Sequence, residues 1–182
     1  MPTPVRPLVP ALNYAPELLL QAQGIRVAFF DVDGVLTDGG LYFSESGETL
    51  KRFSTLDGQG LKLLQQAGIT PVVITGRDSA PLRLRLKALG ITHARFGTED
   101  KRPAAEAFLS ELGLSWSQAA AMGDDWPDLP VMQRVACSNW TKWMQQSPRP
   151  FSPGGWPEGI CFYSLARPLT RWLIALTRLL LA

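Results

Sequence analysis

Short apolar runs that end abruptly at polar residues recur along this chain. Ile25–Phe30, Pro71–Thr75 and Ala119–Met122 are each followed at once by aspartate or by glycine with a charged residue. Runs this short and continuous, bounded by turn residues, predict strands that are buried on both faces of a sheet. Ala94–Phe96 is a weaker run and predicts a fourth strand.

Leucines between these runs recur at helical spacing, and glycines follow them. The pattern predicts helices over Gly60–Ala67, Ala80–Leu89, Pro103–Leu112 and Leu129–Val135. Glycine just past the end of the first three is a common helix stop. Strands that alternate with helices predict an α/β fold, a three-layer α/β/α Rossmann-like domain with a parallel sheet and right-handed crossovers.

One segment breaks this alternation. Leu41–Phe43 and Thr49–Phe53 flank the turn signal Ser44–Gly47, which predicts a β-hairpin after the first strand. The segment between the predicted strands Ile25–Phe30 and Pro71–Thr75 is too short to form a further domain. We therefore expect a capless domain.

The character of the chain changes near residue 136. From Ala136 onward five Lys or Arg face one Glu, a charge of +4 that leaves −2 for residues 1–135, and four of the six tryptophans lie there. Cys137–Pro157 has neither helical nor strand periodicity. We therefore divide the chain into an N-terminal extension (1–20), an α/β core (21–135) and an atypical tail (136–182).

Composition excludes several partners and locations. The net charge is only +2 and the basic residues form no dense cluster, which argues against nucleic acid. Met1–Pro10 lacks the apolar core of a signal peptide. Pro168–Ala182 falls short of the ~20 residues of a membrane span, so a buried or partner-facing helix is favoured over an interfacial one. Cys137 and Cys161 match neither a disulfide framework nor a zinc spacing, so we expect a cytoplasmic protein.

Chemically active residues follow three of the predicted strands. Because the carboxyl ends of parallel strands meet at one edge, Asp31-x-Asp33, Thr75-Gly76 and Asp124-Asp125 are expected to share a site. Hydrolysis of a phosphate monoester uses a carboxylate nucleophile, a second carboxyl group for the proton of the leaving alcohol, and cations for the phosphate oxygens. Carboxylates without adjacent histidine or cysteine suit Mg²⁺ better than Zn²⁺.

Three further residues could hold a phosphoryl group. Thr75 offers a hydroxyl, Gly76 allows close approach of the backbone, and Lys101 offers a compact positive charge. Each candidate also has a structural interpretation, since aspartates cap helices, Thr-Gly forms turns and lysines are usually solvated. Their order along the chain favours a shared phosphate site.

In order and spacing these motifs resemble the haloacid dehalogenase superfamily of phosphatases. The four motifs of that superfamily correspond to Asp31–Asp38, Ile74–Arg77, Lys101 and Gly123–Asp125. The resemblance implies that Asp31 is the nucleophile and a magnesium ligand.

The resemblance also assigns roles to other residues. Asp33 would be the general acid/base and would lend its backbone carbonyl to the metal, and Asp124 would be the second carboxylate on Mg²⁺. The phosphoryl group would be held by Thr75, Gly76 and Lys101, with Asp125 or Asp128 in support.

Within the superfamily, residues 20–135 are similar to the capless phosphatases of 3-deoxy-D-manno-octulosonate 8-phosphate, which act in lipopolysaccharide precursor synthesis. The matching features are Asp31–Gly39, the hairpin, Phe53–Gly58 with its ending Asp57-Gly58-x-Gly60, Thr75–Ser79 and Gly123–Pro130. The resemblance implies a homo-oligomer, a tetramer that closes its own sites. It also implies contacts to the sugar acid or its phosphate from Ser54, Thr55, Asp57, Gly58, Lys62, Arg77 and Arg83.

Two departures from this pattern keep other functions open. Leu56 stands where the family has an arginine, so a phosphatase for a nine-carbon sialic-type acid 9-phosphate is an alternative. After Val135 the family's small-residue strand and Gly-Gly-x-Gly-Ala segment are not found, and Pro153–Gly159 is a poor substitute. A catalytically silent phosphate-binding or regulatory module is the second alternative.

A change of reading frame near residue 136 would explain the abrupt shift in charge and tryptophan content. We predict that one of the other two frames of the coding DNA, translated past codon 136, encodes a Gly-Gly-x-Gly-Ala segment. Sequencing and translating the gene tests this hypothesis, which fails if neither frame contains the segment.

Overall fold

The structure, a computed structural model, describes residues 22–140 and has a five-stranded parallel sheet at its centre. The strand order is β5-β4-β1-β6-β7, with β1 in the middle. The strands are β1 (Val27–Phe30), β4 (Thr70–Ile74), β5 (His93–Arg95), β6 (Ala119–Gly123) and β7 (Cys137–Trp140).

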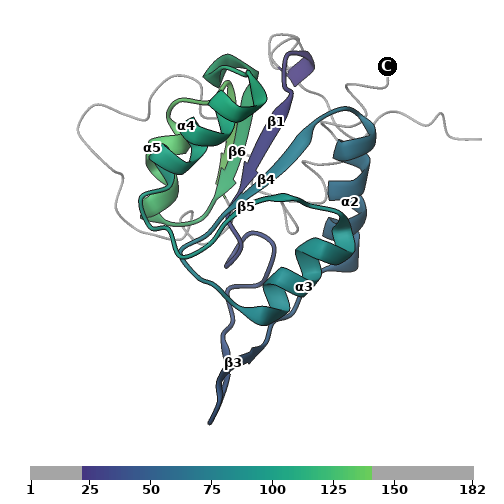
Figure 1. Cartoon of the computed structure of the whole chain (residues 1–182), viewed down its shortest axis with the longest axis vertical. Coiled ribbons are helices and arrows are strands. Elements are labelled where there is room, and N and C mark those ends of the chain that lie inside the picture. Colours follow the sequence, from purple (N-terminus) through teal and green to yellow (C-terminus); the bar gives the residue numbers. More distant parts are fainter. Residues whose placement is uncertain (1–21, 141–182) are drawn as a thin grey trace, which may run out of the picture.

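Helices cover both faces of this sheet (Figure 1). On one face lie α2 (Thr55–Gln66) and α3 (Ala80–Leu89), and on the other lie α4 (Lys101–Leu112) and α5 (Leu129–Met132). The 3₁₀ turns η1 (Trp116–Gln118) and η2 (Trp126–Asp128) flank β6. The three-layer α/β fold class predicted from the sequence is confirmed.

The central strand packs on both faces. Val27 and Phe29 belong to the core cluster under α4 and α5, whereas Ala28 and Phe30 belong to the cluster under α2 and α3. None of the four is more than 3% exposed. A strand buried on both faces needs apolar residues at every position, which is why this run shows no alternation.

The start of α2 differs from the prediction. The helix begins at Thr55 instead of Gly60, because the Ser54 hydroxyl caps it by accepting a hydrogen bond from the Asp57 N–H at 3.4 Å. The start of this helix contains two glycines, which are poor helix formers, so the leucine spacing used for the prediction did not include it. Of the other helices, α3 has the predicted bounds, α4 begins two residues earlier than predicted, and α5 ends three residues earlier than predicted.

The sequence analysis found no strand after Val135, and that prediction is wrong. β7 pairs in parallel with β6, and Ala120 lies beside Cys137 in the register. Cys-Ser-Asn-Trp has little strand propensity of its own, but the edge of β6 supplies backbone partners that a local pattern does not reveal. The sheet therefore continues to Trp140.

Two predictions concern segments outside the described residues. They are the apolar helix over Pro168–Ala182 and the Pro153–Gly159 segment. Within residues 22–140, no helix combines the length and the apolar character needed to cross a bilayer.

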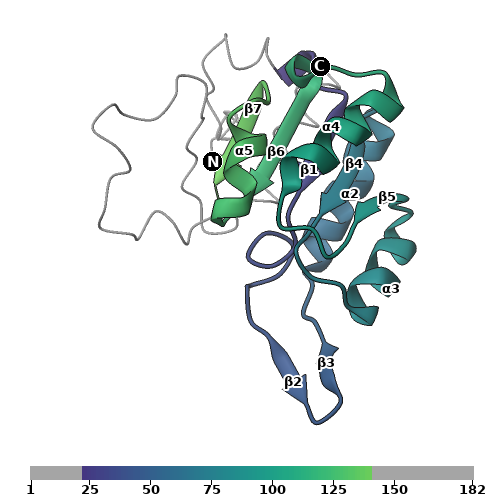
Figure 2. The same cartoon turned by 60° about the vertical axis from the view of Figure 1, so that its left-hand side comes forward.

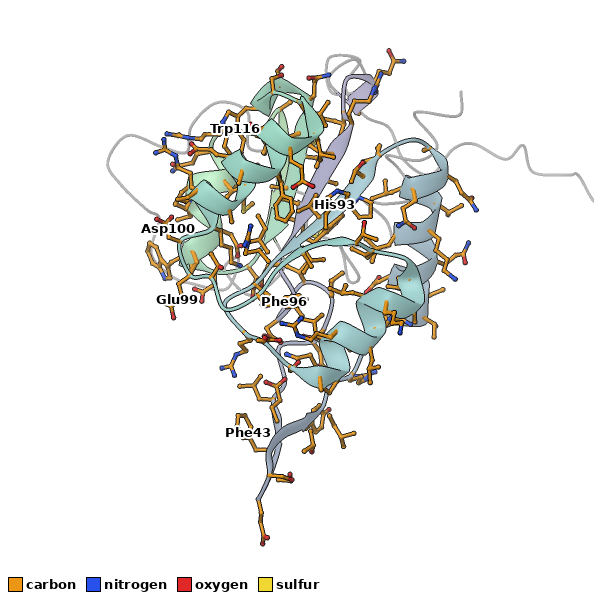
Figure 3. All side chains as sticks on the ribbon, viewed as in Figure 1. Phe43, His93, Phe96, Glu99, Asp100 and Trp116 are labelled. Atoms are coloured by element: carbon orange, nitrogen blue, oxygen red, sulfur yellow. The ribbon has the colours of Figure 1, made fainter. Side chains whose placement is uncertain are left out.

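The predicted hairpin after β1 is present and projects away from the carboxyl edge of the sheet (Figure 2). It consists of β2 (Tyr42–Ser44) and β3 (Gly47–Leu50), and Gly47 closes its turn with φ +96°. Phe43 and Leu50 are each 66% exposed on it, and Phe43 is labelled in Figure 3. Apolar side chains gathered on a projecting element are typical of a contact surface.

Candidate active site

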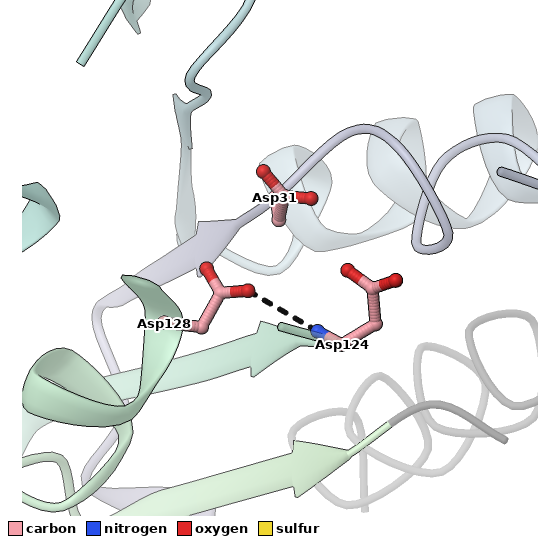
Figure 4. Close-up of side chains that lie close together, drawn as sticks. All are labelled: Asp31, Asp124 and Asp128. Carbon is pink, nitrogen blue, oxygen red and sulfur yellow. Dashed lines mark hydrogen bonds between the residues drawn. The ribbon is translucent and has the colours of Figure 1, made fainter. Parts of the chain in front are cut away.

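Three carboxylates meet at the carboxyl edge of the sheet (Figure 4). Asp31 follows β1, while Asp124 and Asp128 follow β6, and one oxygen of each lies within 4.8 Å of the others. The Asp31 N–H donates to the Met122 carbonyl at 3.1 Å, which holds the two strand ends together. These aspartates therefore share one site, as their positions after parallel strands predict.

Lys101 brings a positive charge to this cluster. It lies in the first turn of α4 and is 5% exposed. Its ammonium group donates to Asp31 Oδ1 at 2.5 Å and to Asp128 Oδ1 at 2.7 Å. Asp128 Oδ2 accepts from the N–H groups of Asp124 and Asp125, at 3.2 Å each. Asp128 therefore fixes both Lys101 and the loop that carries Asp124.

Two glycines allow the strand-end loops to approach this closely. Gly34 has φ +85°, and a Cβ atom there would overlap the Asp124 carboxylate. A Cβ atom at Gly123 would overlap Asp128. Both positions therefore require glycine, the first for its conformation as well as for space.

Burial shifts the titration of this cluster. It raises the pKa of Asp31 to about 6, with Lys101 opposing the shift and Asp128 adding to it. It raises the pKa of Asp124 to about 8, reinforced by the charges of Asp31 and Asp128. Burial alone lowers the pKa of Lys101, but its two carboxylate partners together raise that pKa above its ordinary value. The ammonium group of Lys101 cannot neutralise all three carboxylates of the cluster, and a bound cation would offset the remaining negative charge.

Asp31 and Asp124 have the properties of ligands for a hard divalent cation. The cluster offers carboxylate oxygens only, a donor set that fits Mg²⁺. Asp128 offers less, because both of its oxygens already accept hydrogen bonds. The Asp33 carboxylate is not part of the cluster, so its predicted metal contact would come from its backbone carbonyl.

Asp33 lies in a second group of charged side chains, at the base of the hairpin. Lys51 Nζ donates to Asp33 Oδ1 and forms an ion pair with Glu48 Oε1 at 2.8 Å. Arg77 approaches the other two oxygens, with Nε 3.6 Å from Asp33 Oδ2 and Nη1 3.7 Å from Glu48 Oε2. Asp33, Lys51, Glu48 and Arg77 therefore form a closed ring of alternating charge, here called the Asp33 ring.

Two members of the Asp33 ring, Glu48 and Lys51, were missed in the sequence analysis. On a hairpin, opposite charges three residues apart are typical of a solvated surface. The Lys51 side chain is nevertheless only 1% exposed, and that of Glu48 11%. The signal available in the sequence was that Lys51 lies in the predicted second strand of the hairpin, Thr49–Phe53, which returns toward the sheet edge.

Two of the three predicted phosphate-binding residues, Thr75 and Gly76, lie at the end of β4, whereas Lys101 begins α4. Thr75 is 1% exposed, and its hydroxyl accepts a hydrogen bond from the Arg77 N–H at 3.2 Å. A Cβ atom at Gly76 would meet the Glu99 side chain at 3.8 Å, an ordinary contact, so the fold does not require glycine there. The phosphate-binding role of both residues stays a prediction.

Several other predicted site residues have partners within the protein. Asp125 is exposed and caps η2 by accepting from the Trp126 N–H at 2.7 Å. Ser54 caps α2 as described above, and Gly58 is buried where a Cβ atom would overlap Arg85. Asp125 therefore supports the turn that carries Asp128.

The remaining substrate candidates lie on α2 and α3. Arg83 donates two hydrogen bonds of 2.7 Å to Asp78, and its guanidinium lies 4.1 Å from the ring centre of Phe96. Thr55 and Lys62 are exposed on α2. Substrate contacts from these residues and from Asp57 stay predictions.

Comparison with known proteins identifies relatives of this chain, although no family model matches it. The curated 3-deoxy-D-manno-octulosonate 8-phosphate phosphatase of Yersinia pestis is 40% identical over 124 residues, which are 68% of this chain and 66% of that protein. The match thus spans about two thirds of the relative's length.

Solved structures extend the similarity. A 3-deoxy-D-manno-octulosonate 8-phosphate phosphatase from Yersinia pestis has a TM-score of 0.76 at 32% identity and covers 92% of this chain and 88% of its own. The enzyme of that name from Moraxella catarrhalis, in complex with a magnesium ion, a phosphate ion and KDO, has a TM-score of 0.71 at 29% identity, with coverages of 90% and 93%.

A parallel sheet, a hairpin in place of a cap domain, and strand-end carboxylates joined by a buried lysine define a haloacid dehalogenase-like domain. The chain belongs to the 3-deoxy-D-manno-octulosonate 8-phosphate phosphatase family of that superfamily. The superfamily predicted from the four motifs and the family predicted from the further matching features are both confirmed.

The pKa shifts predict that stability without a divalent cation depends on pH. Because the pKa values of Asp31 and Asp124 are above that of an unfolded aspartate, the folded protein holds more protons than the unfolded one between about pH 4 and pH 8. Stability therefore falls as pH rises through this window. In EDTA, we expect the thermal unfolding midpoint to be lower at about pH 8 than at about pH 5.5.

Mg²⁺ should raise that midpoint by several degrees, and more so at the higher pH, since protons and the cation compete for the same oxygens. Asp124→Asn is the control, because it removes one of the two ligands and the group with the larger shift. An undiminished response to Mg²⁺ in Asp124→Asn would contradict the ligand role of Asp124.

Proposed function

We propose that this chain is a phosphatase that hydrolyses 3-deoxy-D-manno-octulosonate 8-phosphate with Mg²⁺, through an aspartyl-phosphate at Asp31. The observation that supports this most directly is the buried Asp31 carboxylate beside Lys101 and Asp124, at the edge of the sheet where parallel strands end. The names of the relatives support the same activity.

Each step of the reaction has a residue of this chain to perform it. Asp31 attacks phosphorus, the bond to the sugar oxygen breaks, and Asp33 gives its proton to the leaving alkoxide. Asp33 then takes a proton from water, which attacks the aspartyl-phosphate, releases inorganic phosphate and restores Asp31. Lys101 and Thr75 hold the phosphoryl oxygens through both transfers.

Mg²⁺ would be held by Asp31, Asp124 and the Asp33 backbone carbonyl, and would supply positive charge to the phosphoryl oxygens. The raised pKa values of Asp31 and Asp124 support this requirement, because both carboxyl groups ionise more readily beside a cation. The magnesium ion in the Moraxella catarrhalis structure supports the choice of metal.

The proposed substrate carries both a carboxylate and a phosphate. Cationic side chains suit a molecule with two anionic groups, and Arg77, Lys62 and Arg83 are the candidates. The Arg77 side chain is 46% exposed and so remains accessible to a ligand. Ser54, Thr55, Asp57 and Gly58 would line the sugar at the start of α2.

The alternatives have weaker support. A nine-carbon acid 9-phosphate remains chemically compatible, but the relatives named above are phosphatases of the eight-carbon compound. A binding module without catalysis would need neither an Asp31 carboxylate paired with Lys101 nor an Asp33 carboxylate paired with Lys51.

Replacement of the nucleophile tests the proposal. Asp31→Asn should lower phosphate release from 3-deoxy-D-manno-octulosonate 8-phosphate by at least about 10³-fold, because the amide cannot accept the phosphoryl group. Release is measured as inorganic phosphate with Mg²⁺ and again after EDTA, which should abolish it.

Asp100→Asn is the matched control, an exposed aspartate beside Lys101 whose asparagine replacement also favours a helix start (Figure 3). It should keep wild-type activity. Absence of Mg²⁺-dependent release by the unaltered chain would overturn the phosphatase proposal, and release that favours the nine-carbon 9-phosphate would overturn the substrate.

We also propose that copies of this chain assemble through the hairpin, as a cytoplasmic tetramer. The hairpin exposes Leu41, Tyr42, Phe43 and Leu50, each at 42% or more, on an element that projects from the domain. Light scattering should give the mass of a tetramer for the wild type and a smaller mass for Phe43→Glu. Leu84→Glu, at an exposed leucine on α3, should leave the mass unchanged.

A further inference from the structure

The Asp33 ring holds the carboxyl group to which the proposed reaction assigns proton transfer. Three of its four members come from outside the Asp-x-Asp motif, and two of them, Glu48 and Lys51, come from the hairpin. The ring lies beside the carboxylate cluster but shares no member with it. The side chains of the ring are therefore separate from the carboxylates proposed to bind the metal.

Lys51 is the central member of this ring. Its side chain is 1% exposed, and a buried ammonium group is stable only when carboxylates and hydrogen bonds compensate its lost hydration. Asp33 Oδ1 and Glu48 Oε1 both provide that compensation. Lys51 is thus confined between two fixed carboxylates and in turn confines both of them.

The two oxygens of Asp33 are held unequally. Oδ1 accepts a hydrogen bond from Lys51, whereas Oδ2 lies 3.6 Å from Arg77 Nε, and the Arg77 side chain is half-exposed. Oδ2 therefore stays available to exchange a proton, while Oδ1 anchors the carboxyl group. An anchored carboxyl group with one available oxygen is the arrangement that general acid/base catalysis needs.

We propose that Lys51, held by Glu48, is a positioning residue that orients the Asp33 carboxyl group for proton transfer to the leaving oxygen. The inference rests on the phosphatase function proposed above. It gives the hairpin a part in the chemistry in addition to its exposed apolar surface.

Two esters with different leaving groups test the role. The alkoxide of 3-deoxy-D-manno-octulosonate 8-phosphate needs a proton from Asp33, whereas the phenolate of p-nitrophenyl phosphate leaves without one. In the full chain with Mg²⁺, Lys51→Met should lower kcat/KM for the sugar ester by about 10²-fold and for the aryl ester by less than about 3-fold. Glu48→Gln, which keeps Lys51, should give a smaller loss of the same selectivity.

Controls separate positioning from folding. Arg52→Met removes the neighbouring cation, which is 74% exposed and paired with Asp38, and should change neither ester. In an Asp33→Asn background, Lys51→Met should cause no further loss on the sugar ester, since its effect is exerted through Asp33. The retained aryl activity confirms that the variants are folded.

Equal losses on both esters, or an undiminished loss in the Asp33→Asn background, would overturn the positioning role and leave the phosphatase proposal intact. So would an unchanged sugar-ester rate in Lys51→Met. A wild-type chain that cleaves neither ester would instead overturn the phosphatase function itself, and the positioning role with it.

Discussion

The ammonium group of Lys101 is the contact on which the candidate site depends. Parallel strands that end at one edge bring Asp31 and Asp128 together away from water, where their charges repel and lose hydration. Lys101 lies within 2.7 Å of both and makes this approach possible. Glycines leave room for the strand-end loops to approach each other, and Asp128 accepts a hydrogen bond from the loop that carries Asp124. Both features bring the same carboxylates together.

Asp31 and Asp33 are two residues apart but have opposite electrostatic surroundings. Asp31 belongs to a cluster in which carboxylates outnumber the single cation, so it favours a metal ion. Asp33 belongs to a ring in which two cations balance two carboxylates, and no further charge is needed there. One suits a nucleophile that also binds metal, and the other suits a group that moves protons.

The sequence was sufficient to predict the fold and part of the site, for different reasons. Buried strands give continuous apolar runs, and polar residues directly after them, such as Asp31 and Asp124, share an edge by topology alone. β7 was not predicted, because it depends on backbone partners in the distant strand β6. The early start of α2 was not predicted, because it depends on the Ser54 cap and contains glycines instead of regularly spaced leucines. Lys51 was missed for a related reason, since its burial arises from the packing of the hairpin base against Asp33.

The hairpin places neighbouring residues in opposite environments. Leu50 is 66% exposed, while the side chain of Lys51 directly after it is 1% exposed. Because side chains alternate between the two sides of an extended strand, a one-residue insertion or deletion between the turn and Lys51 would exchange them. It would turn leucine toward Asp33 and lysine toward solvent. The length of this strand is therefore constrained in steps of two.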